Sequence, residues 1–121
     1  MSGSDLSNAV PLSPTDFHVL LVLAEEDLYG YAILKAVEEE SSGAVRPEIG
    51  SLYRVLARLM ASGLLQEVEP PADAPRSSRG RPRRYYHLTD LGARVLEADI
   101  RRLEQALALA RARRASKEAP A

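Results

Sequence analysis

The fold of this chain is decided by two stretches, IGSLYRVLARLMASGLL at residues 49–65 and RSSRGRPRRYYHLTDLG at residues 76–92. In the first, apolar residues recur at offsets of 0, 3, 4, 7, 10 and 11, a spacing that places them on one face of a helix. These residues are Ile49, Leu52, Tyr53, Leu56, Leu59 and Met60. Gly63 is expected to end the helix, and two strands are expected at residues 64–69 and 84–88, with a long basic loop between them.

The polar face of this helix holds Ser51, Arg54 and Arg58 and no acidic residue. Arg54 lies near the N-terminal end, where an arginine can pair with guanine in a major groove, and Arg58 lies one turn further on, where it would meet a phosphate. Tyr53 lies on the apolar stripe, so its ring belongs to the core and its hydroxyl to the rim, and a direct DNA contact stays open. The alternative for both arginines is a solvated helix face.

The loop between the two strands is rich in arginine. Its fourteen residues, 70–83, include four prolines, four arginines and one glycine. The arginines of the loop and of the strand that follows are Arg76, Arg79, Arg81, Arg83 and Arg84. Gly80 permits a tight tip that would carry Arg81 into a minor groove, and the alternative is a loop that only aids solubility. Tyr85 and Tyr86 alternate across the second strand, so one should pack on the core and the other should face outward.

Two helices are expected before this region. Ser13 is an N-cap residue, Pro14 suits the first helical position, and Asp16 lies in the first turn, where the helix dipole favours negative charge. This first helix is apolar nearly all round, which predicts a central position. Residues 28–30 form a break before a second helix at about residues 31–40, whose acidic end is interpreted as solvated.

A long last helix is expected at residues 89–114, with Thr89 as its cap. Its apolar residues are spaced by 4, 3, 4 and 3, which is a heptad pattern and indicates a helix–helix seam rather than a core stripe. The seam residues are Leu96, Ile100, Leu103, Leu107 and Ala110. Because the helix extends past the compact part of the domain, a second copy of the chain is the simplest cover, in a two-fold dimer.

Composition narrows the function classes. Residues 1–69 hold 4 basic and 11 acidic groups and residues 70–121 hold 12 basic and 6 acidic groups, so the net charge of −1 hides a basic half that can attract phosphate. The chain has no cysteine, and its two histidines, His18 and His87, do not make a zinc site without further ligands. His18 is interpreted as a plain helix histidine, with a pH-sensitive group as the alternative.

No catalytic, cofactor or metal motif is present, so no enzyme, no cofactor and no metal is expected. No apolar run is long enough to span a membrane and no signal peptide is recognised, so the cytoplasm is the expected location. The expected fold class is mainly α with a small β-hairpin, a winged helix-turn-helix at residues 12–88 followed by a long C-terminal dimerisation helix at residues 89–114. Residues 1–11 and 115–121 are expected to be flexible tails.

Three blocks of the sequence resemble the signature blocks of PadR-type transcriptional regulators. They are LYGYAI at residues 28–33, GSLYRVLARLMASGLL at residues 50–65 and GRPRRYYHLTDLG at residues 80–92. The resemblance covers roughly residues 12–107, and the single last helix resembles the short subgroup of the family. It implies a dimeric bacterial repressor that binds a palindromic site near promoters. It also implies that the last helix pairs with its two-fold mate and leans on the first helix.

The resemblance also implies roles for particular residues. It places the start of the third helix, residues 50–53, at the major groove, Gly80 and Arg81 near the minor groove, and Tyr31 and Lys35 near the phosphate backbone. Arg54 stands where many relatives carry proline, so its base contact is inferred from the residues alone. The DNA-binding set expected from both arguments is Tyr31, Lys35, Gly50, Ser51, Tyr53, Arg54, Arg58, Arg79, Gly80, Arg81 and Arg83.

The expected partners are double-stranded DNA and a second copy of the chain. One alternative is a ligand-sensing repressor with a small-molecule pocket at the dimer interface, between the last helix and residues 20–23. The chain has no tryptophan, so a site that holds flat aromatic drugs between tryptophans, as in some short relatives, is not expected. Another alternative is a winged-helix protein-interaction module that binds no DNA, which would have no need of unopposed arginines in its loop.

Overall fold

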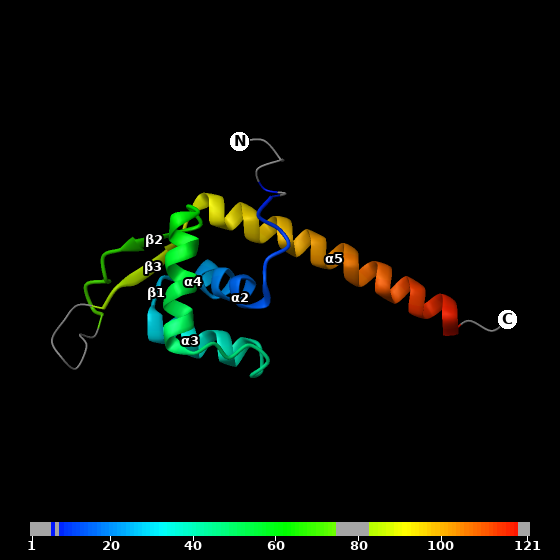
Figure 1. Ribbon diagram of the computed structural model, residues 1–121, viewed down its shortest axis with the longest axis horizontal. Helices are drawn as coiled ribbons and strands as arrows, with labels where there is room; N and C mark the ends of the chain where they lie inside the picture. The colour runs from blue at the N-terminus through cyan, green and yellow to red at the C-terminus, as the bar shows by residue number, and fades with distance from the viewer. Residues whose placement is uncertain (1–5, 7, 75–82, 119–121) are drawn as a thin grey trace.

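The computed structural model describes residues 6, 8–74 and 83–118. The elements run in the order α2 (Pro14–Glu25), β1 (Leu28–Tyr29), α3 (Gly30–Glu40), α4 (Ile49–Ala61), β2 (Leu65–Val68), β3 (Tyr85–Leu88) and α5 (Asp90–Glu118). Three helices and a small sheet form one body, and α5 leaves this body as a long rod (Figure 1). The expected order of helices and strands is therefore present, with one strand added.

The first helix begins as its sequence predicts. The Ser13 hydroxyl accepts a hydrogen bond from the Asp16 backbone N–H at 3.1 Å, and Pro14 is the first helical residue. Val19, Leu20 and Leu23 of α2 are buried in the core, so this helix is central, as its apolar pattern predicted.

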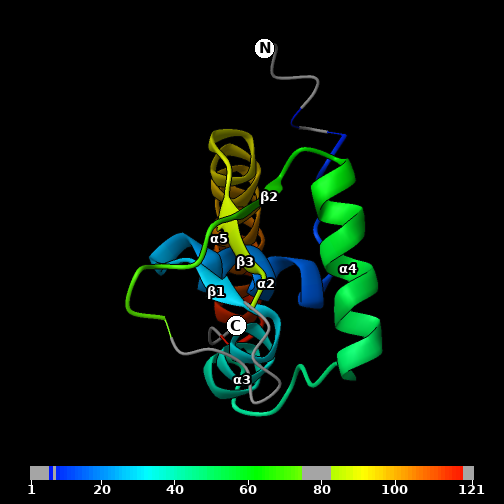
Figure 2. The same ribbon diagram turned by 90° about the vertical axis from the view of Figure 1, so that its left-hand side faces the viewer.

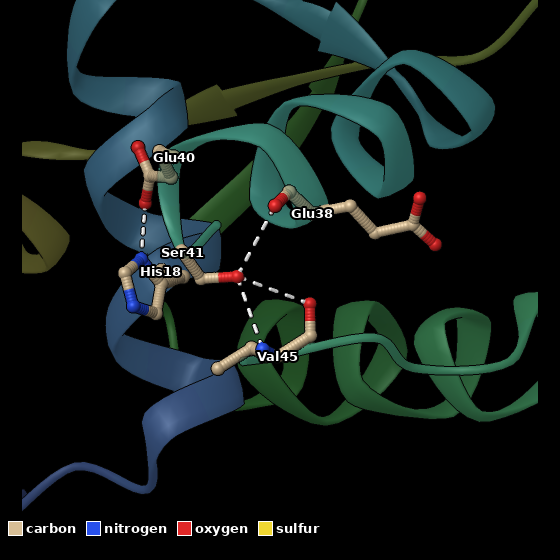
Figure 3. Close-up of polar contacts among 5 residues, drawn as sticks. All are labelled: His18, Glu38, Glu40, Ser41 and Val45. Atoms are coloured by element: carbon tan, nitrogen blue, oxygen red, sulfur yellow. Dashed lines mark hydrogen bonds and ion pairs between the residues drawn. The ribbon is translucent and has the colours of Figure 1, made fainter. Parts of the chain in front are cut away.

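The turn between α3 and α4 is closed by the Ser41 side chain (Figure 3). Its hydroxyl accepts a hydrogen bond from the Val45 N–H at 3.0 Å and lies within reach of the carbonyl oxygens of Glu38 and Val45. At the same corner, the Glu40 carboxylate contacts Nδ1 of His18 on α2. The end of α3 is therefore tied to α2, and Glu40 is more than the solvated end that the sequence predicted.

The sheet has three strands in the order β1-β3-β2, with both pairs antiparallel. Its third strand, β1, was missed by the sequence analysis, which treated residues 28–30 as a break. Leu28 pairs with Tyr86 and Tyr29 pairs with Tyr85, so a partner far along the chain makes this short segment a strand.

Tyr85 and Tyr86 are both buried, so the prediction that one of them faces outward is wrong. Tyr86 belongs to the main core cluster. On the other face of the sheet, the ring of Tyr85 lies 5.6 Å from the ring of Tyr29 on β1. Because β1 pairs with β3, Tyr29 covers Tyr85, which would be more exposed if β3 were an edge strand.

The last helix is capped as expected but is longer than expected. The Thr89 hydroxyl accepts a hydrogen bond from the Gly92 N–H at 3.0 Å and donates one to the Gly63 carbonyl at 2.6 Å. The helix continues to Glu118, so the expected end at residue 114 is wrong. A window of polar residues with good helix propensity extends it beyond the last apolar seam position.

The expected heptad seam divides into two parts. Leu96 is buried in its own core and Ile100 packs against that core, so these two residues are not free for a partner. Leu103 and Leu107 are exposed, as is Ala110. The surface of α5 that its own body leaves uncovered therefore begins at about residue 103.

The segment before α2 is part of the body rather than a loose tail over its described residues. Leu6, Ala9 and Val10 pack against the core, and the Leu12 N–H donates to the buried Asp99 carboxylate on α5 at 3.4 Å. Over the part of the chain that the structure describes, no helix is both long and apolar enough to span a membrane.

Candidate nucleic-acid interface

Helix α4 lies along one flank of the body, at the right in the view of Figure 2. Its buried residues are Leu52, Leu56 and Leu59, whereas Ile49 and Tyr53 are exposed. The apolar stripe expected from the sequence is thus wider than the surface that the core covers, and the expected burial of the Tyr53 ring is wrong. The N-terminal half of α4 offers an outward surface of mixed aromatic and polar character.

On this outward surface, Arg54 and Ser51 lie together. The Arg54 guanidinium donates to the Ser51 hydroxyl at 3.3 Å. Arg54 is exposed, and the side of Gly50 on which a Cβ would stand faces open space. The structure therefore brings together three of the residues expected at the major groove.

Arg58 behaves differently from Arg54. Its guanidinium lies 2.7 Å from a carboxylate oxygen of Asp16 on α2. The Asp16 side chain is 10% exposed and that of Arg58 is 56% exposed. The hydrogen bond with Asp16 raises the pKa of Arg58 above its usual range, against the opposing effect of burial. Arg58 is therefore paired with Asp16 within the protein, whereas the sequence predicted a contact with a DNA phosphate.

A cleft with aromatic and basic walls adjoins the start of α4. It has a volume of about 360 Å³ and is lined by Tyr29, Gly30, Tyr31, Tyr53, Arg83 and Arg84. The Arg83 guanidinium lies over the Tyr29 ring at 4.2 Å, and the Lys35 ammonium lies over the Tyr31 ring at 5.6 Å. Cations held over aromatic rings beside exposed hydroxyl groups suit a phosphate backbone.

Gly30 is what lets Tyr53 lie in this cleft. A Cβ at this position would stand 2.6 Å from the Tyr53 hydroxyl oxygen and 2.8 Å from the ring carbon that bears it. Tyr29 and Gly30 were not among the site residues predicted from the sequence, and Arg84 was predicted only as one of the arginines of the basic loop and its following strand. The signal was the LYGY block, where one glycine stands between two tyrosines at the start of a helix.

Helices α2, α3, α4 and α5 differ at their N-terminal ends. Ser13 caps α2 and Thr89 caps α5 through side-chain hydrogen bonds. The N-cap residues of α3 and α4, Tyr29 and Glu48, make no such bond through their own side chains. The first N–H groups of these two helices thus receive no acceptor from the N-cap side chain, and such groups attract anions.

The two histidines lie in separate pairs. His18 contacts Glu40, and Nδ1 of His87 lies 2.7 Å from an Asp27 carboxylate oxygen. Arg79, Gly80 and Arg81, which the sequence analysis placed at the tip of the basic loop, lie outside the described residues, as does Arg76.

Comparison with known proteins identifies the family. Residues 19–98 match the family model described as the transcriptional regulator PadR-like family. The chain belongs to the PadR family. Its family is one of transcriptional regulators, and it has the winged-helix fold and the long C-terminal helix that the three sequence blocks predicted.

Solved structures support this assignment. A PadR family transcription regulator from Clostridium difficile R20291 is 28% identical, with a TM-score of 0.66 over 80% of this chain and 94% of that one. A PadR family transcriptional regulator from Eggerthella lenta DSM 2243 is 31% identical, with a TM-score of 0.54 over 84% of this chain and 82% of that one.

A curated relative is much longer than this chain. It is an uncharacterized 37.1 kDa protein in transposon TN4556 of Streptomyces fradiae, 40% identical over 81 residues. The match takes in 67% of this chain but spans only 20% of that protein.

Proposed function

We propose that this PadR-family protein is a homodimeric repressor that binds a palindromic promoter site. The observation that carries the proposal is the continuity between the outward surface of α4 and the aromatic and basic cleft beside it. The two surfaces share Tyr53, so a duplex that enters along α4 meets both at once. A winged-helix module that binds only protein has no need of this arrangement.

In the proposed complex, Arg54 and Ser51 read base edges in the major groove, with the open Gly50 beside them. Phosphates are held from the cleft by Tyr31, Tyr53 and Arg83 and beside it by Lys35, and these contacts supply most of the affinity. The loop tip, with Arg79, Gly80 and Arg81, adds contacts in the adjacent minor groove.

The binding experiment is fluorescence anisotropy with a labelled duplex from upstream of the protein's own coding region. Unlabelled native and scrambled duplexes compete at a fixed salt concentration of ~150 mM, because protein–DNA affinities depend strongly on salt. Preference for the native duplex supports a sequence-specific regulator, and truncation then defines the operator. Equal competition by the two duplexes would contradict sequence-specific binding to this promoter.

Mutations separate the major-groove contact of Arg54 from the proposed contact of the loop tip. Arg54→Met should reduce the preference for the native duplex, because one good base contact is worth about 1–3 kcal/mol. Arg81→Ala should weaken binding and lower the salt slope by about one. An unchanged salt slope would count against the proposed wing contact.

The proposed dimer rests on the outer part of α5. Leu103 and Leu107 are exposed on the expected seam, and Leu109 is equally exposed but lies on nearly the opposite side of the helix. Leu107→Asp should yield monomers in sedimentation and should weaken binding to a full palindrome. Leu109→Asp is the matched control and should remain dimeric. Monomers from both variants, or from neither, would show that this seam is not the interface.

A second candidate function is effector sensing. A cavity of about 250 Å³ lies between the segment before α2, the end of α4 and the start of α5. Its walls include Leu12, Leu59, Leu91 and Val95, rather than residues 20–23 that the sequence analysis named; Leu20 and Leu23 are buried. A thermal-shift screen tests this candidate, since a ligand that binds the folded state raises the unfolding temperature. A hit that leaves DNA affinity unchanged would contradict it.

A further inference from the structure

The ion pair between Asp16 and Arg58 joins α2 to α4, two helices whose buried apolar residues belong to the same core cluster. The closest backbone packing of α4 is against α3 and β2, the elements that precede and follow it in the chain. Among the described residues, this pair is the side-chain hydrogen bond that ties α4 to another helix. It reaches from the third turn of α4 to the first turn of α2, which is anchored in the core.

Arg58 is poorly placed to serve DNA as well. The Asp16 carboxylate is nearly buried, so a guanidinium that swings out to a phosphate leaves behind a poorly solvated carboxylate without its charged partner. The contact at 2.7 Å is also that of a charge-assisted hydrogen bond. Arg54, one turn earlier on the same face, makes only a hydrogen bond to a hydroxyl and is free to move.

We infer that Arg58 is a positioning residue: with Asp16 it fixes α4 against α2, so that Ser51 and Arg54 meet base edges at a set angle. The inference rests on the proposed DNA-binding function. It replaces the phosphate contact that the sequence predicted for Arg58, and it gives the buried Asp16 a role in recognition.

The two roles for Arg58 predict opposite effects of Asp16→Asn. If Arg58 held a phosphate, removal of the Asp16 carboxylate would free the Arg58 guanidinium and make the DNA-binding surface more positive. DNA binding would then tighten and the salt slope would steepen. If Arg58 positions α4, the same substitution loosens the helix. Preference for the native duplex then falls, although the loss of a negative charge by itself favours phosphate binding.

The test compares Asp16→Asn, Arg58→Met and the double variant in the anisotropy competition. We expect each single variant to lose about tenfold in the ratio of native to scrambled affinity, and the double variant to lose no more than either, because one interaction is removed in all three. The slope of affinity against salt should stay at its wild-type value. Glu39→Gln, an exposed carboxylate at the end of α3, is the control for charge alone and should keep the wild-type preference.

Amide hydrogen exchange of α4 in the free protein provides a second readout. Exchange over residues 54–61 should quicken by the same factor in both single variants and by no further factor in the double variant. Tighter DNA binding by Asp16→Asn, or a lower salt slope in Arg58→Met, would overturn the inference.

If the wild-type protein shows no preference for the native duplex, the proposed function fails. Hydrogen exchange in the two single variants and the double variant then still decides whether the Asp16–Arg58 pair fixes α4. Additive effects, or no effect on exchange, would refute the positioning role of Arg58.

Discussion

Replacing Gly92 by alanine should destabilise the protein, although helix propensity favours alanine here by ~1 kcal/mol. Gly92 lies in the first turn of α5, where the helix crosses the end of the chain segment that leads into β2. A Cβ at this position would stand 2.2 Å from the Leu64 carbonyl oxygen and 2.6 Å from Cδ1 of Leu88. The Leu88 side chain can turn aside, but the Leu64 carbonyl is backbone and accepts the Thr89 N–H at 3.1 Å.

The size of the effect follows from this contact. Real Cβ atoms essentially never lie closer than 3.0 Å to a non-bonded heavy atom. The distance of 2.2 Å between the added Cβ and the Leu64 carbonyl oxygen must therefore grow by roughly 0.8 Å, which requires α5 to move. Such overpacking costs about 1–3 kcal/mol, and the strained Thr89–Leu64 hydrogen bond adds up to ~1 kcal/mol. After the gain in helix propensity, we expect a net loss of about 2 kcal/mol, which lowers the unfolding temperature by roughly 10 °C in a small domain.

Circular dichroism during heating and during urea titration measures the change. Gly50→Ala is the matched control, because this glycine is also in the first turn of a helix but has no atom within 4 Å of the added Cβ. It should unfold at the wild-type temperature or slightly above. An unfolding temperature for Gly92→Ala at or above that of the wild type would refute the steric argument.

Three further predictions concern other parts of the body. Gly30→Ala should displace the Tyr53 ring from the cleft and weaken DNA binding severalfold at nearly unchanged stability, because the ring is 47% exposed and can move; equal losses of affinity and stability would contradict this. Ser42 has a positive φ of 53°, so Ser42→Gly should raise stability by about 0.5 kcal/mol in urea titration, whereas Ser41→Ala, which breaks the turn hydrogen bonds, should lower it by ~1 kcal/mol. Burial raises the pKa of Tyr86 above its ordinary value of 10.0, so the folded state holds the phenol proton more tightly than the unfolded state. The stability that this difference contributes is intact below about pH 10 and is lost as the pH rises further. Tyr86→Phe should flatten the fall in unfolding temperature above about pH 10, and identical profiles for the two proteins would contradict the shift.

Local signals in the sequence determined much of the fold. Ser13 and Thr89 begin their helices through hydrogen bonds to residues three positions on, and such short-range contacts are readable from neighbouring letters. The spacing of the buried residues of α4 was equally clear. The family blocks then supplied the arrangement of these elements, which periodicity alone does not contain.

The features that sequence analysis missed depend on contacts between distant segments. The two residues of β1 become a strand only because β3 lies beside them, and this pairing also buries Tyr85. The pairing of Arg58 with Asp16 joins residues on separate helices, so the polar face of α4 gave no sign that one arginine was already engaged. The apolar pattern of α4 likewise could not show that Tyr53 lies beyond the edge of the core.

The difference between the capped and the uncapped helices has a consequence for engineering. A good N-cap stabilises a helix by roughly 1 kcal/mol, so α4, which begins after Glu48, is an obvious place to add stability with Asp or Ser. Under the proposed function, that added oxygen would occupy the donors that a phosphate needs. Variants selected only for heat resistance should therefore accumulate N-cap residues at α4 and lose operator binding at the same time. Substitutions at the start of α5, which Thr89 already caps, should leave operator binding unchanged.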